Sequence, residues 1–135
     1  MREIVCIGTE EEVTSFLALC RVMIESFLAR IDLPVECAAA ADAFFDAARD
    51  PKFLAQKVAP LKTELLFDGR VALGSLNFHR DYFGTAYAIT LGGRPAFSGC
   101  VAFGIERWLL AILTHFGLKL ENWPALRDSH YGGYA

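Results

Sequence analysis

The sequence predicts an α+β domain in which mostly antiparallel strands are covered on one face by two amphipathic helices. Two observations carry this prediction: apolar residues alternate over residues 1–8 and again over 99–103, and each alternating run is followed by a segment with helical spacing. The chain has 135 residues, which fits one domain with its own core. Its 54% hydrophobic content predicts an apolar surface that takes a partner.

The first part of the chain, before Pro34, begins with a strand and continues into a long helix. In "MREIVCIG", Glu3, Val5 and Ile7 alternate with residues of the opposite face. Thr9 and Glu12 then have the spacing of a capping box, which starts a helix. The helix is expected to end before Pro34, and its buried face consists of residues three or four positions apart: Val13, Phe16, Leu17, Cys20, Ile24, Phe27, Leu28 and Ile31.

The rest of the chain is predicted to complete the sheet. "PVECAAA" is typical of a short strand. Residues 41–60 are expected to form a helical turn or a long excursion. Residues 61–90 contain two strand-like runs separated by Asp68-Gly69, which predicts an antiparallel hairpin. Residues 91–99 are expected to form a loop, 99–103 the last strand, and 105–116 the last helix, closed by Gly117.

The last strand offers two different faces. Val101 and Phe103 would pack under the helices, while Cys100, Ala102 and Gly104 would form a floor of small residues on which a flat ring can lie. Arg107, one turn into the helix, would stand beside that floor as a cation suited to phosphate. A solvated helix start explains Glu106 and Arg107 as well.

Composition and spacing exclude several classes of protein. A net charge of -3 gives no basic field for nucleic acid. No apolar run reaches the length of a membrane span, and no signal-peptide pattern is present, so a cytoplasmic protein is expected. The four cysteines, Cys6, Cys20, Cys37 and Cys100, contain no C-x-x-C pair, which argues against a zinc ribbon or redox dithiol.

A resemblance to a known family adds to this interpretation. "CVAFGIERWLLAIL" resembles motif 3 of class II aminoacyl-tRNA synthetases, with small and hydrophobic positions alternating before Glu-Arg and a hydrophobic helix. With "MREIVCIGTEEEV", "LKTELL", "SLNFHRDYFG" and "HFGLKLENWPALR", nearly the whole chain is similar to the seryl-tRNA-synthetase-like amino acid:[carrier protein] ligases. The implied fold is the antiparallel catalytic core of class II synthetases, in part.

The resemblance implies a reaction, substrates and partners. These ligases use ATP, with magnesium, to convert a small amino acid to an aminoacyl-adenylate. They then transfer the aminoacyl group to the phosphopantetheine thiol of an acyl or peptidyl carrier protein, without tRNA or a membrane. By the same resemblance Arg107 would be the catalytic arginine on the ATP phosphates, and Lys62, Glu64 and Asn77 would line the adenylate pocket. Glu3 and Cys100 would be zinc ligands; a small strand residue chosen for size is the other explanation of Cys100.

The chain also departs from the family pattern. The family's first zinc cysteine, motif 1 with its dimer interface and motif 2 with its α-phosphate arginine are not found in this sequence. Cys6 cannot replace that cysteine, because alternation places it opposite Glu3. Residues 1–135 are therefore expected to be a single domain, the C-terminal part of such a core, with an exposed strand edge that self-associates as a dimer or pairs with an N-terminal-half partner. The alternative function is a non-catalytic remnant or subunit that binds a carrier protein.

Two further features have both a functional and a structural explanation. His79 in "NFHRDYFG" is either a general base near the substrate or a structural histidine. Lys52, Lys57 and Lys62 lie in a segment without acids; they form either a docking surface for an acidic carrier protein or a solvated helix face.

Overall fold

A computed structural model of the chain describes residues 1–40 and 61–125. The expectations for residues 41–60, including the docking role of Lys52 and Lys57, lie outside the described residues. So does the C-terminal end of the chain from residue 126 onward.

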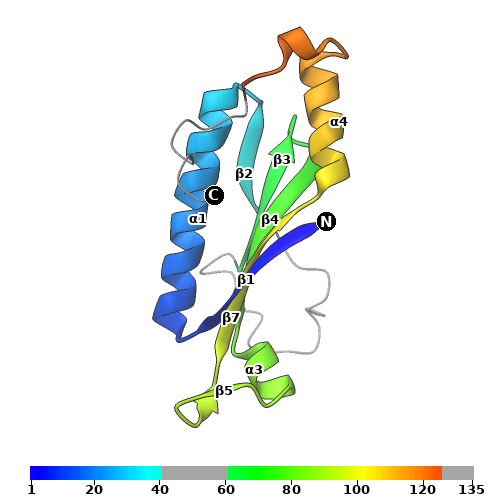
Figure 1. Ribbon diagram of the computed structural model, residues 1–135. Coiled ribbons are helices and arrows are strands. Elements are labelled where there is room, and N and C mark those ends of the chain that lie inside the picture. Colours follow the sequence, from blue (N-terminus) through cyan, green and yellow to red (C-terminus); the bar gives the residue numbers. More distant parts are fainter. Residues whose placement is uncertain (41–60, 126–135) are drawn as a thin grey trace, which may run out of the picture.

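The described residues build one antiparallel sheet of five strands in the order β1-β7-β4-β3-β2 (Figure 1). Each neighbouring pair is antiparallel. The predicted α+β class with an antiparallel sheet is therefore confirmed. The five strands are β1 (Arg2–Gly8), β2 (Val35–Ala40), β3 (Lys62–Phe67), β4 (Val71–Arg80) and β7 (Phe97–Phe103).

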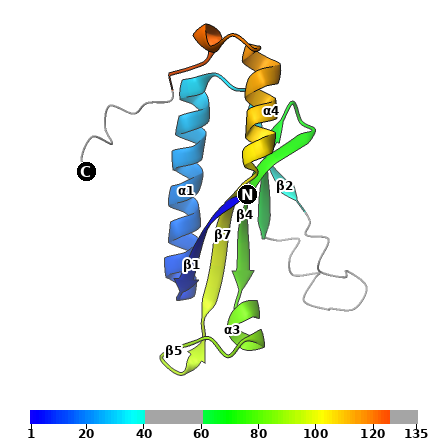
Figure 2. The same cartoon turned by 45° about the vertical axis from the view of Figure 1, so that its right-hand side comes forward.

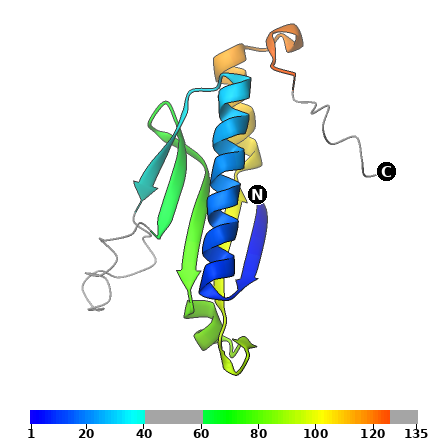
Figure 3. The ribbon, with the colours of Figure 1, turned by 90° about the vertical axis from the view of Figure 1, so that its left-hand side faces the viewer.

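Two helices, α1 (Glu10–Ile31) and α4 (Ile105–Phe116), cover one face of this sheet (Figure 2). Viewed from the helix side, α1 crosses the sheet with β1 on one flank and β4, β3 and β2 on the other (Figure 3). The rings of Phe27 on α1 and Trp108 on α4 lie 6.2 Å apart, so the helices also touch each other. The core between helices and sheet contains Ile24, Leu28, Ile31, Leu33, Leu65, Phe67, Leu73, Leu76, Val101 and Ala111.

The helix ends follow the sequence signals. Thr9 Oγ1 accepts a hydrogen bond from the Glu12 amide, and the Glu12 carboxylate accepts from the Thr9 amide, which completes the predicted capping box. The helix α4 has the predicted bounds, and Gly117 beyond it has φ 78°. Within residues 1–40 and 61–125, no helix is both long and apolar enough to cross a membrane.

The hairpin between β3 and β4 is also confirmed. Asp68 and Gly69 have φ of 50° and 64°, the left-handed values required by a tight hairpin turn. The Arg70 amide closes the turn on the Phe67 carbonyl at 3.1 Å.

Residues 81–98 differ from the sequence prediction. A short helix α3 (Tyr82–Ala86) replaces the end of the predicted second strand, because Arg80 adopts φ 54° and ends β4 there. The predicted loop contains a small hairpin of β5 (Thr90–Leu91) and β6 (Arg94–Pro95), joined at glycines with positive φ. The last strand begins at Phe97, two residues before the predicted Gly99. A short 3-10 helix, η1 (Leu120–Asn122), follows α4.

Candidate functional site

The sheet face opposite the helices carries the small residues of β7. Val101 is 1% exposed and lies in the core, whereas its neighbours Cys100 and Ala102 face the other side of the sheet. Across the strands, Ala102 pairs with Glu3 on β1 and with Ser75 on β4. This arrangement matches the floor of small residues expected from the alternation in the sequence.

One cavity of about 360 Å3 lies over this floor and gathers three of the predicted site residues. Lys62 and Glu64 reach it from β3, and Arg107 reaches it from the first turn of α4. Lys62 Nζ and Glu64 Oε1 form a partly buried ion pair at 3.0 Å. Gly74, Ser75, Ala102 and Gly104 add little side-chain bulk to the lining. The other lining residues are Met1, Ala72, Leu73 and Glu106. Lys62 and Arg107 thus place two cations at the rim of this cavity.

A bulge in β4 holds the start of α4 in place. The pairing of β3 with β4 shifts register at Leu73, so the carbonyls around this residue are free to turn toward α4. The Leu73 carbonyl accepts from the Gly104 amide at 2.8 Å, and the Ala72 carbonyl accepts from Arg107 Nη1 at 2.9 Å. A side chain at Gly74 would collide with the Ala102 carbonyl, so the bulge requires glycine there.

A second cavity of about 420 Å3 adjoins Cys100 on the same sheet face. Its polar end consists of Glu3, His79, Ser98 and Cys100. His79 Nδ1 lies 3.3 Å from Ser98 Oγ, and His79 Nε2 lies 3.7 Å from Cys100 Sγ. The remaining wall is apolar and comes from β1, α3 and the segment around β5 and β6: Val5, Ile7, Phe83, Gly84, Tyr87, Ile89 and Ala96.

Asn77 lies between the two cavities. Its Nδ2 donates to Ser75 Oγ at 3.0 Å, on the side of the first cavity, and to Cys100 Sγ at 3.3 Å, on the side of the second. Asn77 thus bridges Ser75, in the cavity lined by Lys62, Glu64 and Arg107, and Cys100, in the cavity lined by Glu3. We call these two cavities with Asn77 between them the candidate site.

The surroundings of Cys100 favour the protonated thiol by raising its pKa. Burial raises its pKa above the ordinary value, the hydrogen bond from Asn77 offsets part of that increase, and the nearby Glu3 carboxylate adds to it. A thiol ligand must lose its proton to bind zinc. A positive charge near Cys100 would oppose this shift and favour the thiolate.

The described residues do not complete a zinc site. Glu3 and Cys100 line one cavity, as the resemblance implies, but residues 1–40 and 61–125 contain no group of three His, Cys, Asp or Glu side chains placed to hold a metal. A catalytic zinc takes three protein ligands and keeps one position open. Cys6 does not supply the third, because it lies near Cys20 of α1, on the helix side of the sheet.

Sequence reasoning missed the two serines and the wall provided by α3. Ser98 is buried on the same face of β7 as Cys100, and extending the predicted strand to residue 97 would have revealed it by alternation. The helix α3 packs so closely that a side chain at Gly84 would collide with the Ala96 backbone. The Phe83 ring stands edge-on to His79, with centroids 4.9 Å apart.

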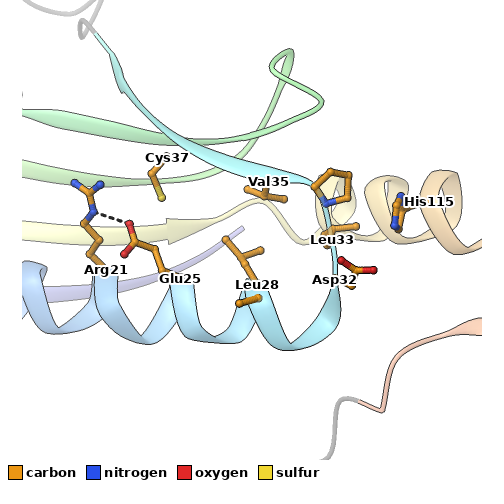
Figure 4. Close-up of a pocket in the computed structure, with 10 residues that line it drawn as sticks. Arg21, Glu25, Leu28, Asp32, Leu33, Val35, Cys37 and His115 are labelled. Carbon is orange, nitrogen blue, oxygen red and sulfur yellow. Dashed lines mark hydrogen bonds and ion pairs between the residues drawn. The ribbon is translucent and has the colours of Figure 1, made fainter.

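Another cavity, of about 590 Å3, lies elsewhere, between α1, β2 and α4 (Figure 4). Arg21 and Glu25 form an ion pair at 2.8 Å on its wall. The Cys37 thiol next to them has a raised pKa, chiefly because it is partly buried. His115 lines the far end. None of the predicted site residues is in this cavity.

Comparisons with known proteins agree with the resemblance. The chain is 38% identical to amino acid–[acyl-carrier-protein] ligase 1 of Bradyrhizobium diazoefficiens and 36% identical to ligase 2 of the same organism. Each match covers 95% of this chain but only 41% and 40%, respectively, of the two ligases. No family model matches the chain.

The solved structures support the same fold. The chain superposes on the seryl-tRNA synthetase of M. kandleri, solved in complex with A. aeolicus tRNASec, with a TM-score of 0.76 and 20% sequence identity. The superposition covers 91% of this chain and 26% of that one. The predicted resemblance to seryl-tRNA-synthetase-like carrier protein ligases, and the predicted partial class II core, are therefore confirmed. The chain spans about two fifths of the length of the ligases that it matches.

Proposed function

We propose that this chain supplies part of the catalytic core of an amino acid:[carrier protein] ligase. In this proposal the complete core activates a small amino acid with ATP and transfers it to the phosphopantetheine thiol of an acyl or peptidyl carrier protein. The observation that carries the proposal is the convergence of Arg107, Lys62 and Glu64 over a floor of small residues, directly beside the cavity that holds Glu3 and Cys100.

Arg107 is suited to binding the phosphates of ATP. One of its five N–H donors is occupied by the Ala72 carbonyl, and this bond fixes the direction of the guanidinium. The remaining donors can face a polyphosphate in the bidentate geometry that arginine provides. An anchored cation stabilises the charge that develops as pyrophosphate leaves, at little cost in reorganisation.

The rest of the first cavity would hold the adenosine. Ala102, Gly74 and Gly104 leave room for a ring on the sheet, and the Lys62–Glu64 pair offers both a donor and an acceptor at its edge. Because Asn77 is tied to Ser75 and Cys100, its orientation is fixed where the adenosine side meets the amino acid side.

The proposed reaction has two steps. A carboxylate oxygen of the amino acid attacks the α-phosphorus of ATP, the bond from that phosphorus to the β-phosphate oxygen breaks, and pyrophosphate leaves with magnesium. The pantetheine sulfur then attacks the carbonyl carbon of the adenylate, AMP leaves, and the thiol proton is lost to solvent or a base. Neither step uses a covalent bond to the protein, so positioning and charge stabilisation provide the catalysis.

Zinc stays part of the proposal only for a core with an additional ligand. Glu3 and Cys100 are suitable donors, but two ligands do not make the three-ligand site that a catalytic zinc requires. We therefore assign no step of the reaction to a metal held by this chain alone.

The test is amino-acid-dependent exchange of labelled pyrophosphate into ATP. The purified chain is assayed with glycine, alanine and serine, with and without a zinc chelator, next to an Arg107→Ala variant. If the proposal holds for the isolated chain, exchange depends on the amino acid and falls at least about tenfold in the variant. No exchange from a folded chain, combined with no exchange after the rest of a ligase core is added, would refute it.

One observation favours the alternative function, a non-catalytic subunit that binds a carrier protein or pairs with a partner chain. The Arg107 guanidinium is bonded to the β4 backbone, which is also what a purely structural arginine would do. A chain of this kind would bind a carrier protein equally well before and after Arg107→Ala, and it would never support pyrophosphate exchange.

A further inference from the structure

The cavity between α1, β2 and α4 is separate from the candidate site and differs from it in chemical character. Its volume of about 590 Å3 lies in the range of small-molecule sites. The described residues that line it are all different from those that line the candidate site. Arg21 lies at one end and Asp32 at the other (Figure 4), and we call it the α1–β2 cavity.

The sequence of β2 explains why this region is hollow. Val35 and Cys37 pair with Phe67 and Leu65 of β3, two core residues, so they point to the helix side of the sheet. Cys37 is small, and three alanines follow it. β2 therefore does not fill the space beside α1 as a strand of large residues would.

One end of the α1–β2 cavity carries a cation. Arg21 and Glu25 lie one turn apart on α1, and Arg21 Nε donates to Glu25 Oε1 at 2.8 Å. This bond uses one of the five N–H donors of the guanidinium and fixes its plane. The donors on the two Nη atoms have the forked geometry that binds a carboxylate.

The other end carries an anion. Asp32 follows the last turn of α1 and has φ 53°. Its side chain lies at the His115 end of the cavity (Figure 4). Among the described residues Asp32 makes no ion pair. An ammonium group can form a charge-assisted hydrogen bond with Asp32, and a neutral His115 imidazole can accept a second one.

Apolar side chains lie between the two charged ends. Leu28 and Leu33 are 6% and 4% exposed, and Val35 is half-buried. Asp32 follows Arg21 by 11 positions, which is about 16 Å along a helix axis. A hydrogen bond of about 2.9 Å at each end leaves roughly 10 Å, the length of an extended chain of about eight carbons.

We propose that the α1–β2 cavity binds an unbranched ω-amino acid, with its carboxylate on Arg21, its ammonium on Asp32 and its methylene chain over the apolar residues between them. Two charged ends distinguish this class of ligand from fatty acids and alkylamines, which have only one. The proposal is independent of the proposed function, because it uses no residue of the candidate site.

The probe is 8-aminooctanoate, titrated into the isotope-labelled chain and followed by NMR of the backbone amides. We expect saturable shifts at Val35, Cys37 and His115 with a Kd of about 1 mM or below, while the amides of the candidate site stay in place. Three control ligands should bind at least about fivefold more weakly: 4-aminobutanoate, which is too short, and octanoate and octylamine, which each lack one charged end.

Two variants with matched controls locate the ligand. Arg21→Gln removes the cation from the cavity, and Arg30→Gln removes one from the same helix outside the lining. Asp32→Asn removes the anion, and Asp68→Asn makes the same change at another residue with positive φ, outside the cavity. Asparagine tolerates this backbone conformation. We expect the Kd to rise at least about fivefold in Arg21→Gln and Asp32→Asn and to stay unchanged in the two controls, with all four amide spectra showing a folded chain.

Three outcomes would overturn the proposal. The first is the absence of a saturable shift with 8-aminooctanoate at about 10 mM, ten times the expected Kd. The second is equally tight binding of octanoate or octylamine, because recognition of two charged ends would then be excluded. The third is a Kd that changes in neither Arg21→Gln nor Asp32→Asn, or changes equally in their controls, since the ligand would then bind elsewhere.

Discussion

Exchanging the sizes of two neighbours on β7 would test the division of the sheet into a core face and a site face. Val101 is 1% exposed and packs in the core, while the adjacent Ala102 lines the first cavity. The variants are Val101→Ala, which removes two methyl groups from the core, and Ala102→Val, which adds two to the cavity. Each changes the same volume, but on opposite faces.

The two changes should differ in their cost to stability. Loss of two buried methyl groups costs about 1.6 kcal/mol at roughly 0.8 kcal/mol each, and the cavity left behind brings the total to about 2–3 kcal/mol. For a domain of this size, the melting temperature should fall by roughly 8–12 °C. Ala102 is itself only 8% exposed but lines the first cavity, so Ala102→Val adds atoms on the cavity side and its effect should stay near or below about 1 kcal/mol.

ATP binding should show the reverse order, with a larger loss in Ala102→Val than in Val101→Ala. Bound ligand stabilises a protein by about 2.7 kcal/mol at a concentration one hundred times its Kd. We therefore expect saturating ATP with magnesium to raise the urea midpoint of wild type and Val101→Ala, but not that of Ala102→Val, whose added methyl groups occupy the floor. Urea titrations followed by circular dichroism, with and without ATP, measure both effects.

Two results would refute this reasoning. If Ala102→Val destabilises the chain as much as Val101→Ala, the small residues of β7 are packed against something and do not form an open floor. If ATP stabilises Ala102→Val as strongly as wild type, the nucleotide does not lie on this surface.

Two further predictions concern ionisable groups. Thr9→Ala should lower stability at neutral pH by about 1 kcal/mol, measured by urea unfolding, because it removes the N-cap of α1. The hydrogen bonds from Thr9 hold the pKa of Glu12 below its usual value. Their stabilising effect is therefore present above the pKa that Glu12 has in the unfolded chain, and it is lost as the pH falls through the pKa that Glu12 has in the folded chain. The loss of stability caused by Thr9→Ala should shrink in acid, and a loss that grows in acid would contradict the geometry. Glu3→Gln should lower the pKa of Cys100, because it removes a nearby negative charge. Alkylation of Cys100 near pH 8 in the presence of a chelator, followed by mass spectrometry, should then be faster than in the wild type. An unchanged rate, or the same acceleration in a Glu10→Gln control, would place Glu3 away from Cys100.

The elements that sequence reasoning predicted correctly are those whose signals are local. The capping box at Thr9, the turn at Asp68-Gly69 and the period-2 pattern of β1 depend on residues within a few positions of one another. The helix α3 was missed because its position depends on a distant contact, the close approach of Gly84 to the Ala96 backbone. No property of residues 81–86 alone signals that contact.

The part of the site formed by β1 and β7 was predictable from the sequence pattern, whereas the part formed by β3, β4 and α4 was not. Alternation alone shows which residues of β1 share a face with Glu3, and the register of β1 with β7 brings that face next to Cys100. The meeting of Lys62 and Glu64 with Arg107 depends on the pairing of β3 with β4 and of β4 with β7. More than forty positions separate Lys62 from Arg107 in the sequence, so only the family resemblance related them.

The sequence changes from strand-like alternation to helical spacing at Glu106-Arg107, and this change has a structural cause that is independent of catalysis. Gly104 follows β7 and donates its amide to the Leu73 carbonyl, and the chain then turns into α4. Glu106 lies in the first turn of α4, where the helix dipole favours a negative charge, and Arg107 bonds to the carbonyl of Ala72 in the β4 bulge. The same bond that joins the helix to the sheet holds the guanidinium at the rim of the first cavity. An Arg107→Lys variant separates the two roles, because lysine can keep one hydrogen bond to Ala72 but lacks the remaining planar donors. Stability close to wild type with loss of ATP binding would assign Arg107 to the phosphates, whereas equal losses of both would assign it to the joint between helix and sheet.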